Sequence, residues 1–204
     1  MSEQTEPLHV AVVGAGPLAQ DLVRGLADLG HDAELTDSSL PGDGRLDAAV
    51  FAPWHPAAMT PKRLVDLTDR EFGDAWQDTL DDAMAMCKRA RDRFGGNGGR
   101  LVMVVPTIAM AGGDGYAHWA AAAEGVHLLA KSATRQWGTE GIAANVLAVG
   151  PEGVLADPVA AGPVSIASPA LPDADPGEVL AFLCSPAAAN LGGQTLVVDG
   201  GLWM

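Results

Sequence analysis

Aromatic residues and cysteines are both scarce in this chain. Aromatic side chains make up 5% of the 204 residues, so the core must be built mainly from Ala, Val and Leu. The two cysteines, Cys87 and Cys184, each lie in an apolar helical pattern without a CxxC neighbour. We therefore expect no disulfide framework, no zinc site and no other bound metal.

Basic residues are also few, because 12 Lys and Arg stand against 26 Asp and Glu, for a formal net charge of -14. This acidity argues against nucleic acid and anionic membrane surfaces as partners. No apolar run approaches the roughly 18 residues that a membrane span needs. Residues 1–7 are polar and acidic and do not resemble a secretory signal, so we expect a cytoplasmic protein.

Short apolar runs alternate with helical patterns along the chain. The expected strands are 8–13, 32–36, 46–52, 100–105, 142–149 and 195–198. The expected helices are 17–29, 70–94, 116–137 and 176–183. This alternation predicts one α/β domain over residues 1–204, with a parallel sheet between two layers of helices.

A glycine turn follows the first expected strand and opens the first helix. Gly14, Gly16 and Ala19 fit the pattern GxGxxA, and Pro17 suits a first helical turn. The glycines permit a tight turn and the approach of a pyrophosphate, while Asp37, about 20 residues on, could bond a ribose hydroxyl. The pattern predicts an NAD site, and the alternative is that the fold alone requires the turn and no cofactor binds.

Three stretches in the second half resemble the short-chain dehydrogenase/reductases, in their ketoacyl-reductase-like branch. They are GRLV at 99–102, GIAANV at 141–146 and GGQTLVVDGG at 192–201. The last is specific, and the resemblance covers essentially the whole chain. It implies a Rossmann-like, doubly wound α/β fold of three layers.

The resemblance has one gap, between Asp37 and Leu46. Family members usually have a helix, a strand and another helix there, whereas residues 38–45 are too few for a crossover unit. The missing strand would be the outermost one, so we expect a sheet of about six strands. Strand 32–36 then becomes an edge, and one wall of the usual adenine pocket is lost.

The resemblance also locates the family's catalytic positions. In the family, a Tyr donates the proton, a Lys four residues later lowers its pKa, a Ser orients the substrate and an Asn supports a water relay. Ungapped alignment through 141–145 places Trp119 at the Tyr, Ala123 at the Lys, Pro106 at the Ser and Thr79 near the Asn. None of these residues can perform the corresponding step, so the sequence predicts no catalytic residue at the family positions.

Neighbouring residues could in principle form a relocated site. Thr107 follows the Ser position, and Tyr116 has no cation four residues on. His118 precedes Trp119 by one residue, so we expect it to point about 100° away around the helix. His127 and Lys131 lie two turns further along, where a core or solvated histidine is the simpler interpretation.

Family members assemble through the two long helices, here 70–94 and 116–137, and through the C-terminus. Asp78, Asp81 and Asp82 would make one patch acidic, which could favour a less acidic partner over a second copy, or could be only a solvated face. The leading hypothesis is a non-catalytic subunit of a hetero-oligomer with an active dehydrogenase. That dehydrogenase would act on a hydroxyacyl or ketoacyl thioester or a similar secondary alcohol.

Two alternatives stay open. One is an active NAD(P)-dependent oxidoreductase with a rearranged site. The other is a ligand-binding domain that uses the old pocket, lined by Trp54, Trp119 and Pro106.

Overall fold

Six parallel strands form the centre of the fold, in the order β2-β1-β3-β4-β5-β6. A computed structural model describes residues 6–159 and 175–201. The strands are β1 (His9–Val13), β2 (Asp32–Thr36), β3 (Ala48–Phe51), β4 (Gly99–Pro106), β5 (Ile142–Val149) and β6 (Thr195–Val198). The predicted sheet of about six strands is confirmed, and β2 is its edge as expected.

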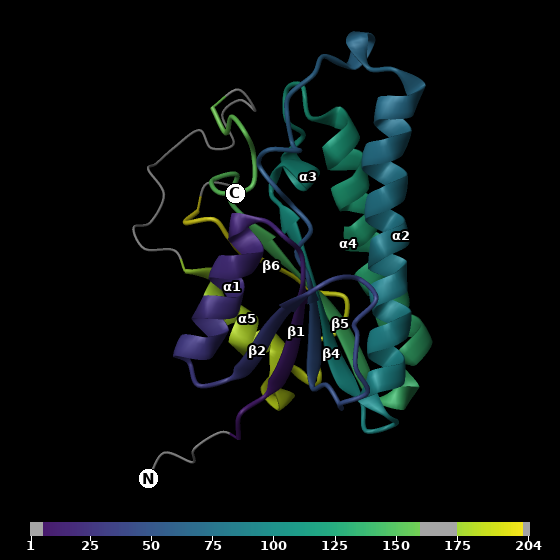
Figure 1. Cartoon of the computed structure of the whole chain (residues 1–204), viewed down its shortest axis with the longest axis vertical. Helices are drawn as coiled ribbons and strands as arrows, with labels where there is room; N and C mark the ends of the chain where they lie inside the picture. The colour runs from purple at the N-terminus through teal and green to yellow at the C-terminus, as the bar shows by residue number, and fades with distance from the viewer. Residues whose placement is uncertain (1–5, 160–174, 202–204) are drawn as a thin grey trace.

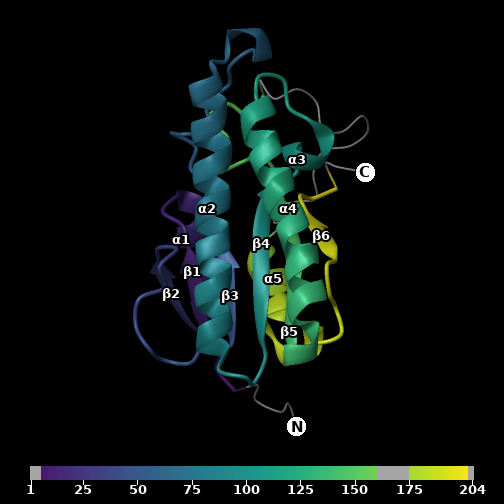
Figure 2. The same cartoon turned by 90° about the vertical axis from the view of Figure 1, so that its right-hand side faces the viewer.

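Helices cover both faces of this sheet (Figure 1, Figure 2). One layer holds α1 (Pro17–Asp28) and α5 (Pro176–Cys184), which pack on each other; the other holds α2 (Asp69–Phe94) and α4 (Ala117–Trp137). A short helix, α3 (Ile108–Ala111), precedes α4. The three-layer, doubly wound α/β fold predicted from the sequence is confirmed.

The central strands are buried on both sides because both faces of the sheet are covered. Every residue of β3 and of β5 is buried, and both strands consist mainly of Ala, Val and Leu. Continuous apolar runs of this kind are typical of parallel strands between two helix layers. Although aromatic residues are scarce, the largest fully buried side chains are four of them: Trp54, Tyr116, Phe51 and Phe94.

Local capping fixes the ends of α2. The Thr68 hydroxyl accepts from the Glu71 backbone N–H, and the Glu71 carboxylate accepts from the Thr68 backbone N–H, which forms a capping box. At the other end Gly95 adopts a left-handed conformation with φ of 61°. These two signals place the ends of α2 within one residue of the predicted helix 70–94.

The shortened connection 38–45 packs directly against α2. Arg93 donates to the backbone carbonyls of Pro41 and Gly44, and Arg89 donates to the carbonyl of Ser39. Leu40 is fully buried despite a left-handed φ of 44°. The connection thus contains no crossover helix or strand, as its length predicted, and it packs on α2 instead.

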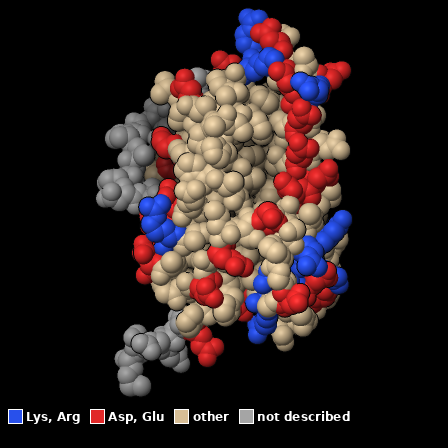
Figure 3. Space-filling model, viewed as in Figure 1, with Lys and Arg blue, Asp and Glu red and all other residues tan. Residues whose placement is uncertain are grey.

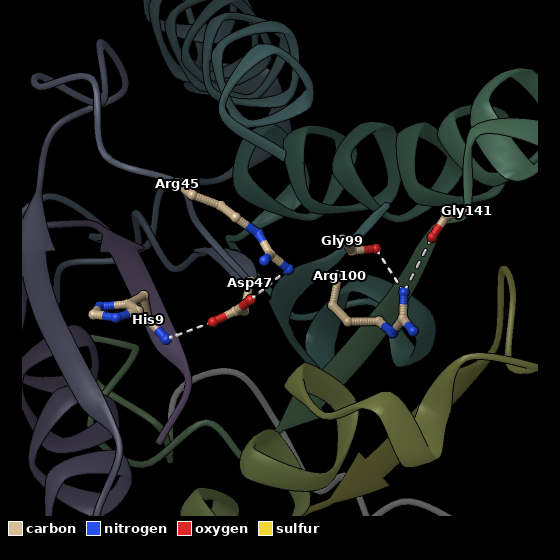
Figure 4. Close-up of polar contacts among 6 residues, drawn as sticks. All are labelled: His9, Arg45, Asp47, Gly99, Arg100 and Gly141. Atoms are coloured by element: carbon tan, nitrogen blue, oxygen red, sulfur yellow. Dashed lines mark hydrogen bonds and ion pairs between the residues drawn. The ribbon is translucent and has the colours of Figure 1, made fainter. Parts of the chain in front are cut away.

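The return of this connection into β3 is held at the amino-terminal edge of the sheet (Figure 4). Asp47 accepts from the backbone N–H of His9 at 3.0 Å and from the Arg45 guanidinium at 3.2 Å. Further along the same edge, Arg100 donates to the carbonyls of Gly99 and Gly141, at 2.9 and 3.2 Å. The polar groups drawn there mainly satisfy one another and the backbone.

Two predictions fall partly outside the described residues. The surface loop expected at 152–175 is described only up to residue 159 and at residue 175. The C-terminus, expected to contribute to assembly, is described up to residue 201.

Candidate functional site

A groove of about 470 Å³ lies beside the carboxyl end of β3, which is the edge of an α/β sheet where ligands usually bind. Three elements line it: the connection between β3 and α2 (residues 53–67), one face of α2 (residues 71–82), and the first turn of α4. We call this space the α2 groove. Its volume lies within the range of small-molecule sites.

His118 and Trp119 both line the α2 groove. Their ring centroids are 5.3 Å apart, with a tilt of 43° between the ring planes. The expectation that His118 points away from Trp119 is therefore wrong. Both residues stand in the first turn of α4, where the long connection 53–67 curves around the helix end, so one cavity borders two adjacent helical positions.

Two residues that line the α2 groove each carry a buried polar atom without a hydrogen-bond partner in the described part of the chain. These atoms are Nδ1 of His118 and Nε1 of Trp119. Burial lowers the pKa of His118, which favours its neutral imidazole, while the nearby Glu71 carboxylate acts in the opposite direction. Unpaired buried donors and acceptors are rare in folded proteins, so these two atoms in the first turn of α4 are an exception beside the groove.

The positions assigned to catalysis by the family resemblance lie around the groove and behind it. Thr79 lines the groove and donates its hydroxyl to the Ala75 carbonyl at 2.8 Å, while Pro106 ends β4. Trp119 and Ala123 lie one turn apart on α4, so they share a helix face, and Ala123 is fully buried. The structure thus places the Trp119 indole and the Ala123 methyl group on one face of α4, and their correspondence to the family's Tyr and Lys stays a prediction.

Tyr116 and Thr107, two of the residues that could form a relocated site, are buried in the core. The Tyr116 hydroxyl donates to the Asp157 carbonyl at 3.1 Å, and burial raises the pKa of this tyrosine. Thr107 is fully buried, and its hydroxyl has no partner among the described residues. Thr107 adjoins Pro106 at the end of β4, so its hydroxyl lies next to the position that the resemblance assigns to Ser.

His127 lies on a different part of α4. Its Nε2 is 2.8 Å from the Thr195 hydroxyl at the start of β6, and its Nδ1 is 3.3 Å from the Glu124 carboxylate. Both ring nitrogens are therefore satisfied within the chain. This arrangement explains His127 as a structural link between α4 and β6, and Lys131 packs against Gly193 nearby.

The glycine turn has the strand–turn–helix geometry that its sequence predicts, with Pro17 as the first residue of α1. A Cβ at Gly14 would lie 2.2 Å from the Ala52 carbonyl oxygen, and a Cβ at Gly16 would lie 2.5 Å from that of Trp54. The backbone after β3 thus occupies the space that the missing side chains leave. Packing alone accounts for both glycines, so the turn by itself does not indicate a cofactor.

Asp37, the residue predicted to bond a ribose, is exposed just beyond β2. One of its carboxylate oxygens accepts from both the backbone N–H and the hydroxyl of Ser39, and these bonds lower the pKa of Asp37. The next residue, Ser38, donates to the Asp82 carboxylate at 2.6 Å. Ala19 is buried against the first glycine, as the third position of the pattern requires. Cofactor binding by these residues stays a prediction.

Acidic side chains run in a column over α2, beside a hollowed and largely uncharged surface (Figure 3). The carboxylates that line the α2 groove are those of Glu71, Asp74, Asp78 and Asp82. Asp81 does not line it. Of the three residues in the predicted acidic patch, Asp78 and Asp82 therefore line the groove, whereas Asp81 lies outside it.

Among the described residues, no three His, Cys, Asp or Glu side chains are grouped so as to hold a metal ion. None of the described helices combines the length and the apolarity that a membrane crossing requires.

Comparison with known proteins shows the family. A family profile described as enoyl-(acyl carrier protein) reductase matches residues 27–203. The 3-oxoacyl-(acyl-carrier-protein) reductase FabG of Vibrio cholerae is 30% identical over 149 residues, which are 69% of this chain and 61% of the relative. The hydroxyacyl-CoA dehydrogenase ChsB1 of Mycobacterium tuberculosis is 28% identical over 200 residues, 93% of this chain and 60% of the relative.

The chain belongs to the short-chain dehydrogenase/reductase family. It spans about 60% of the length of the curated relatives that it matches. Among solved structures, a gluconate 5-dehydrogenase from Beutenbergia cavernae, described with bound NADP, superposes with a TM-score of 0.75 at 21% identity. That superposition covers 97% of this chain and 98% of the other, and it shows the shared fold.

Proposed function

We propose that this chain is a non-catalytic member of the family, which assembles with a catalytically active short-chain dehydrogenase and supports it. The observation that carries the proposal is the set of residues at the catalytic positions. Pro106, Trp119 and Ala123 stand where the family has Ser, Tyr and Lys. The active partner acts on a hydroxyacyl or ketoacyl thioester, or on a similar secondary alcohol.

Each replacement removes a step of carbonyl reduction. An indole N–H is not acidic enough to act as a general acid, and alanine has no charge with which to lower a neighbour's pKa. Proline has no hydroxyl to orient a substrate oxygen. The nearest phenol, Tyr116, is committed to the Asp157 backbone and has Ala120 one helical turn further on. Tyr116 therefore has no cation one turn along α4 with which to perform this chemistry.

The outer face of α2 and α4 supports the assembly. Trp76, Met84 and Leu128 are large apolar side chains that lie exposed on these two helices, and Leu128 is 57% exposed. The family uses this helix pair for assembly, and exposed apolar groups on such a face indicate a contact surface. The names of the relatives, a 3-oxoacyl reductase and a hydroxyacyl-CoA dehydrogenase, support the substrate class of the partner.

The assembly is tested by co-expression with a catalytically competent family member encoded beside this chain. Size-exclusion chromatography with mass measurement is expected to show a complex of both chains. Leu128→Glu puts a charge on the proposed interface and is expected to weaken the complex at least tenfold, which is about 1.4 kcal/mol. The control is Leu29→Glu at the end of α1, a leucine that is 46% exposed on the opposite layer.

A second candidate is an active nicotinamide-dependent oxidoreductase, favoured by the glycine turn directly before α1 and by Asp37 at the end of β2. In that case Gly14, Gly16 and the start of α1 would hold the pyrophosphate, Asp37 would bond a ribose, and the cofactor would supply hydride transfer. Titration of NADH into the purified chain decides between the two candidates. Saturable binding with turnover of a ketoacyl thioester would contradict the non-catalytic assignment.

A further inference from the structure

We propose that the α2 groove binds a small organic cation, namely a protonated amine or guanidinium carried on an apolar body. The groove binds this ligand whether or not the chain assembles with a partner. The inference goes beyond the proposed function and stands on the charge, the lining and the unsatisfied polar atoms of the groove itself.

The charge of the groove is set by α2. Positions 71, 74, 78 and 82 follow helical spacing, so one face of the helix presents a line of carboxylates to the cavity. Glu71 is engaged by the Lys62 ammonium at 2.5 Å, and Asp82 accepts from the Ser38 hydroxyl at 2.6 Å. Asp74 and Asp78 have no side-chain partner among the described residues. These two carboxylates are one helical turn apart and are available to a cation.

The lining opposite this wall is apolar and aromatic. Trp54 is 1% exposed and lines the groove, and Met59 and Leu67 contribute aliphatic surface to the same lining. Trp119 borders the cavity from α4. Indole rings attract cations through the negative charge on their faces, and apolar lining with a few polar groups is the usual composition of a small-molecule site.

His118 gives an independent indication of a ligand. It lines the groove, is only 6% exposed, and its Nδ1 lacks a hydrogen-bond partner within the described chain. The neighbouring Trp119 Nε1 is likewise buried and unpaired. Leaving a buried polar group unsatisfied is unfavourable, so a small movement of either ring that let its nitrogen bond a polar ligand in the groove would remove this penalty.

Other ligand classes fit the groove less well. An anion would face the carboxylates of Asp74 and Asp78, while the one ammonium in the lining, Lys62, is already paired with Glu71. A metal ion needs a cluster of ligating side chains, and the described residues contain no group of three that could hold one. A protonated amine or guanidinium on an apolar body can bind with only the two carboxylates for its charge and the indole rings for its apolar part.

The test uses three indole probes of one shape and different charge: tryptamine, tryptophol and indole-3-acetate. Isothermal titration calorimetry on the full chain is expected to show saturable tryptamine binding, with tryptophol at least about tenfold weaker and indole-3-acetate not bound. In an ¹⁵N NMR spectrum, tryptamine is expected to shift the indole N–H signal of Trp119, assigned with Trp119→Phe. The indole N–H of Trp76, which is exposed on α2 and does not line the groove, serves as the internal reference.

The variant D74N/D78N keeps the shape of both exposed side chains and removes their charge. It is expected to bind tryptamine no better than tryptophol. The control D81N/D92N removes the same charge from exposed α2 positions outside the groove and is expected to bind tryptamine like the unaltered chain. Equal affinity for tryptamine and tryptophol, equal loss in both variants, or no saturable tryptamine binding up to about 10 mM would overturn the proposal.

Discussion

The indole N–H of Trp54 donates a 2.6 Å hydrogen bond to the backbone carbonyl of Val104. β3 pairs with β4 only as far as Phe51 and Met103, whereas β4 continues to Pro106. Trp54 therefore satisfies a carbonyl of β4 beyond the end of the β3 ladder. The same residue lines the α2 groove, so one side chain contributes both to the end of the sheet and to the wall of the groove.

Trp54→Phe is expected to lower the free energy of unfolding by about 1–3 kcal/mol, because the Val104 carbonyl would lose its partner in a buried place. Urea denaturation followed by circular dichroism measures this change. Trp76→Phe, which alters an exposed tryptophan, is the matched control and is expected to change stability by no more than about 0.5 kcal/mol. Similar losses in the two variants would show that the Trp54 bond does not stabilise the fold.

Gly16→Ala is expected to destabilise the chain by about 1–3 kcal/mol, because its Cβ would meet the Trp54 carbonyl oxygen at 2.5 Å. Gly73→Ala in α2 is expected to stabilise the chain by roughly 0.5–1 kcal/mol, because nothing lies within 4 Å of its Cβ and alanine favours a helix. Thermal and urea unfolding of both variants measure the contrast. A neutral Gly16→Ala would mean that the turn is not packed as described.

Stability is expected to depend on the ionisation of Glu71. Its bond with Lys62, followed by its bonds with Thr68, lowers the pKa of Glu71 from 4.5 to about 2. A lowered folded-state pKa stabilises the protein above the unfolded pKa, and this stability is lost as pH falls towards the folded value. The advantage of the unaltered chain over Glu71→Gln should therefore shrink between pH 4.5 and about pH 2.

The control for this pH dependence is the same comparison in a Lys62→Met background. Because the Lys62 bond is the largest cause of the lowered pKa, the acid-sensitive part of the difference should become smaller there. Urea midpoints measured across the pH range give both curves. A difference between the unaltered chain and Glu71→Gln that stays constant from about pH 6 to pH 2.5 would contradict the assignment.

Much of the fold could be predicted because local patterns agree with the tertiary structure. The largely apolar run 142–149 and the closing run 195–198 form β5 and β6 with the same bounds. The absence of a crossover unit between β2 and β3 could be predicted because the eight residues 38–45 are too few to form one. α3 was not predicted, because its four residues are too few to show a helical period.

The groove could not be predicted in the same way. The helical angle between His118 and Trp119 describes an isolated helix, whereas the connection 53–67 wraps the end of α4 and brings both rings to one cavity. Sequence spacing identified an acidic patch on α2 but could not separate Asp78 and Asp82, which line the groove, from Asp81. That division depends on which elements pack beside α2, and this information is tertiary.

We propose that this chain assembles with an active dehydrogenase but does not itself catalyse the reaction. The most direct test measures the mass of the assembled species and the rate of substrate turnover in the same samples. The chain is purified alone and with a catalytically competent family member encoded beside it, and each sample is assayed by size-exclusion chromatography with mass measurement and with NADH and a ketoacyl thioester. We expect no turnover by the chain alone, a complex of both chains, and weaker assembly with Leu128→Glu but not with Leu29→Glu. A stable homomer that ignores the partner, or turnover by the chain alone, would contradict the account.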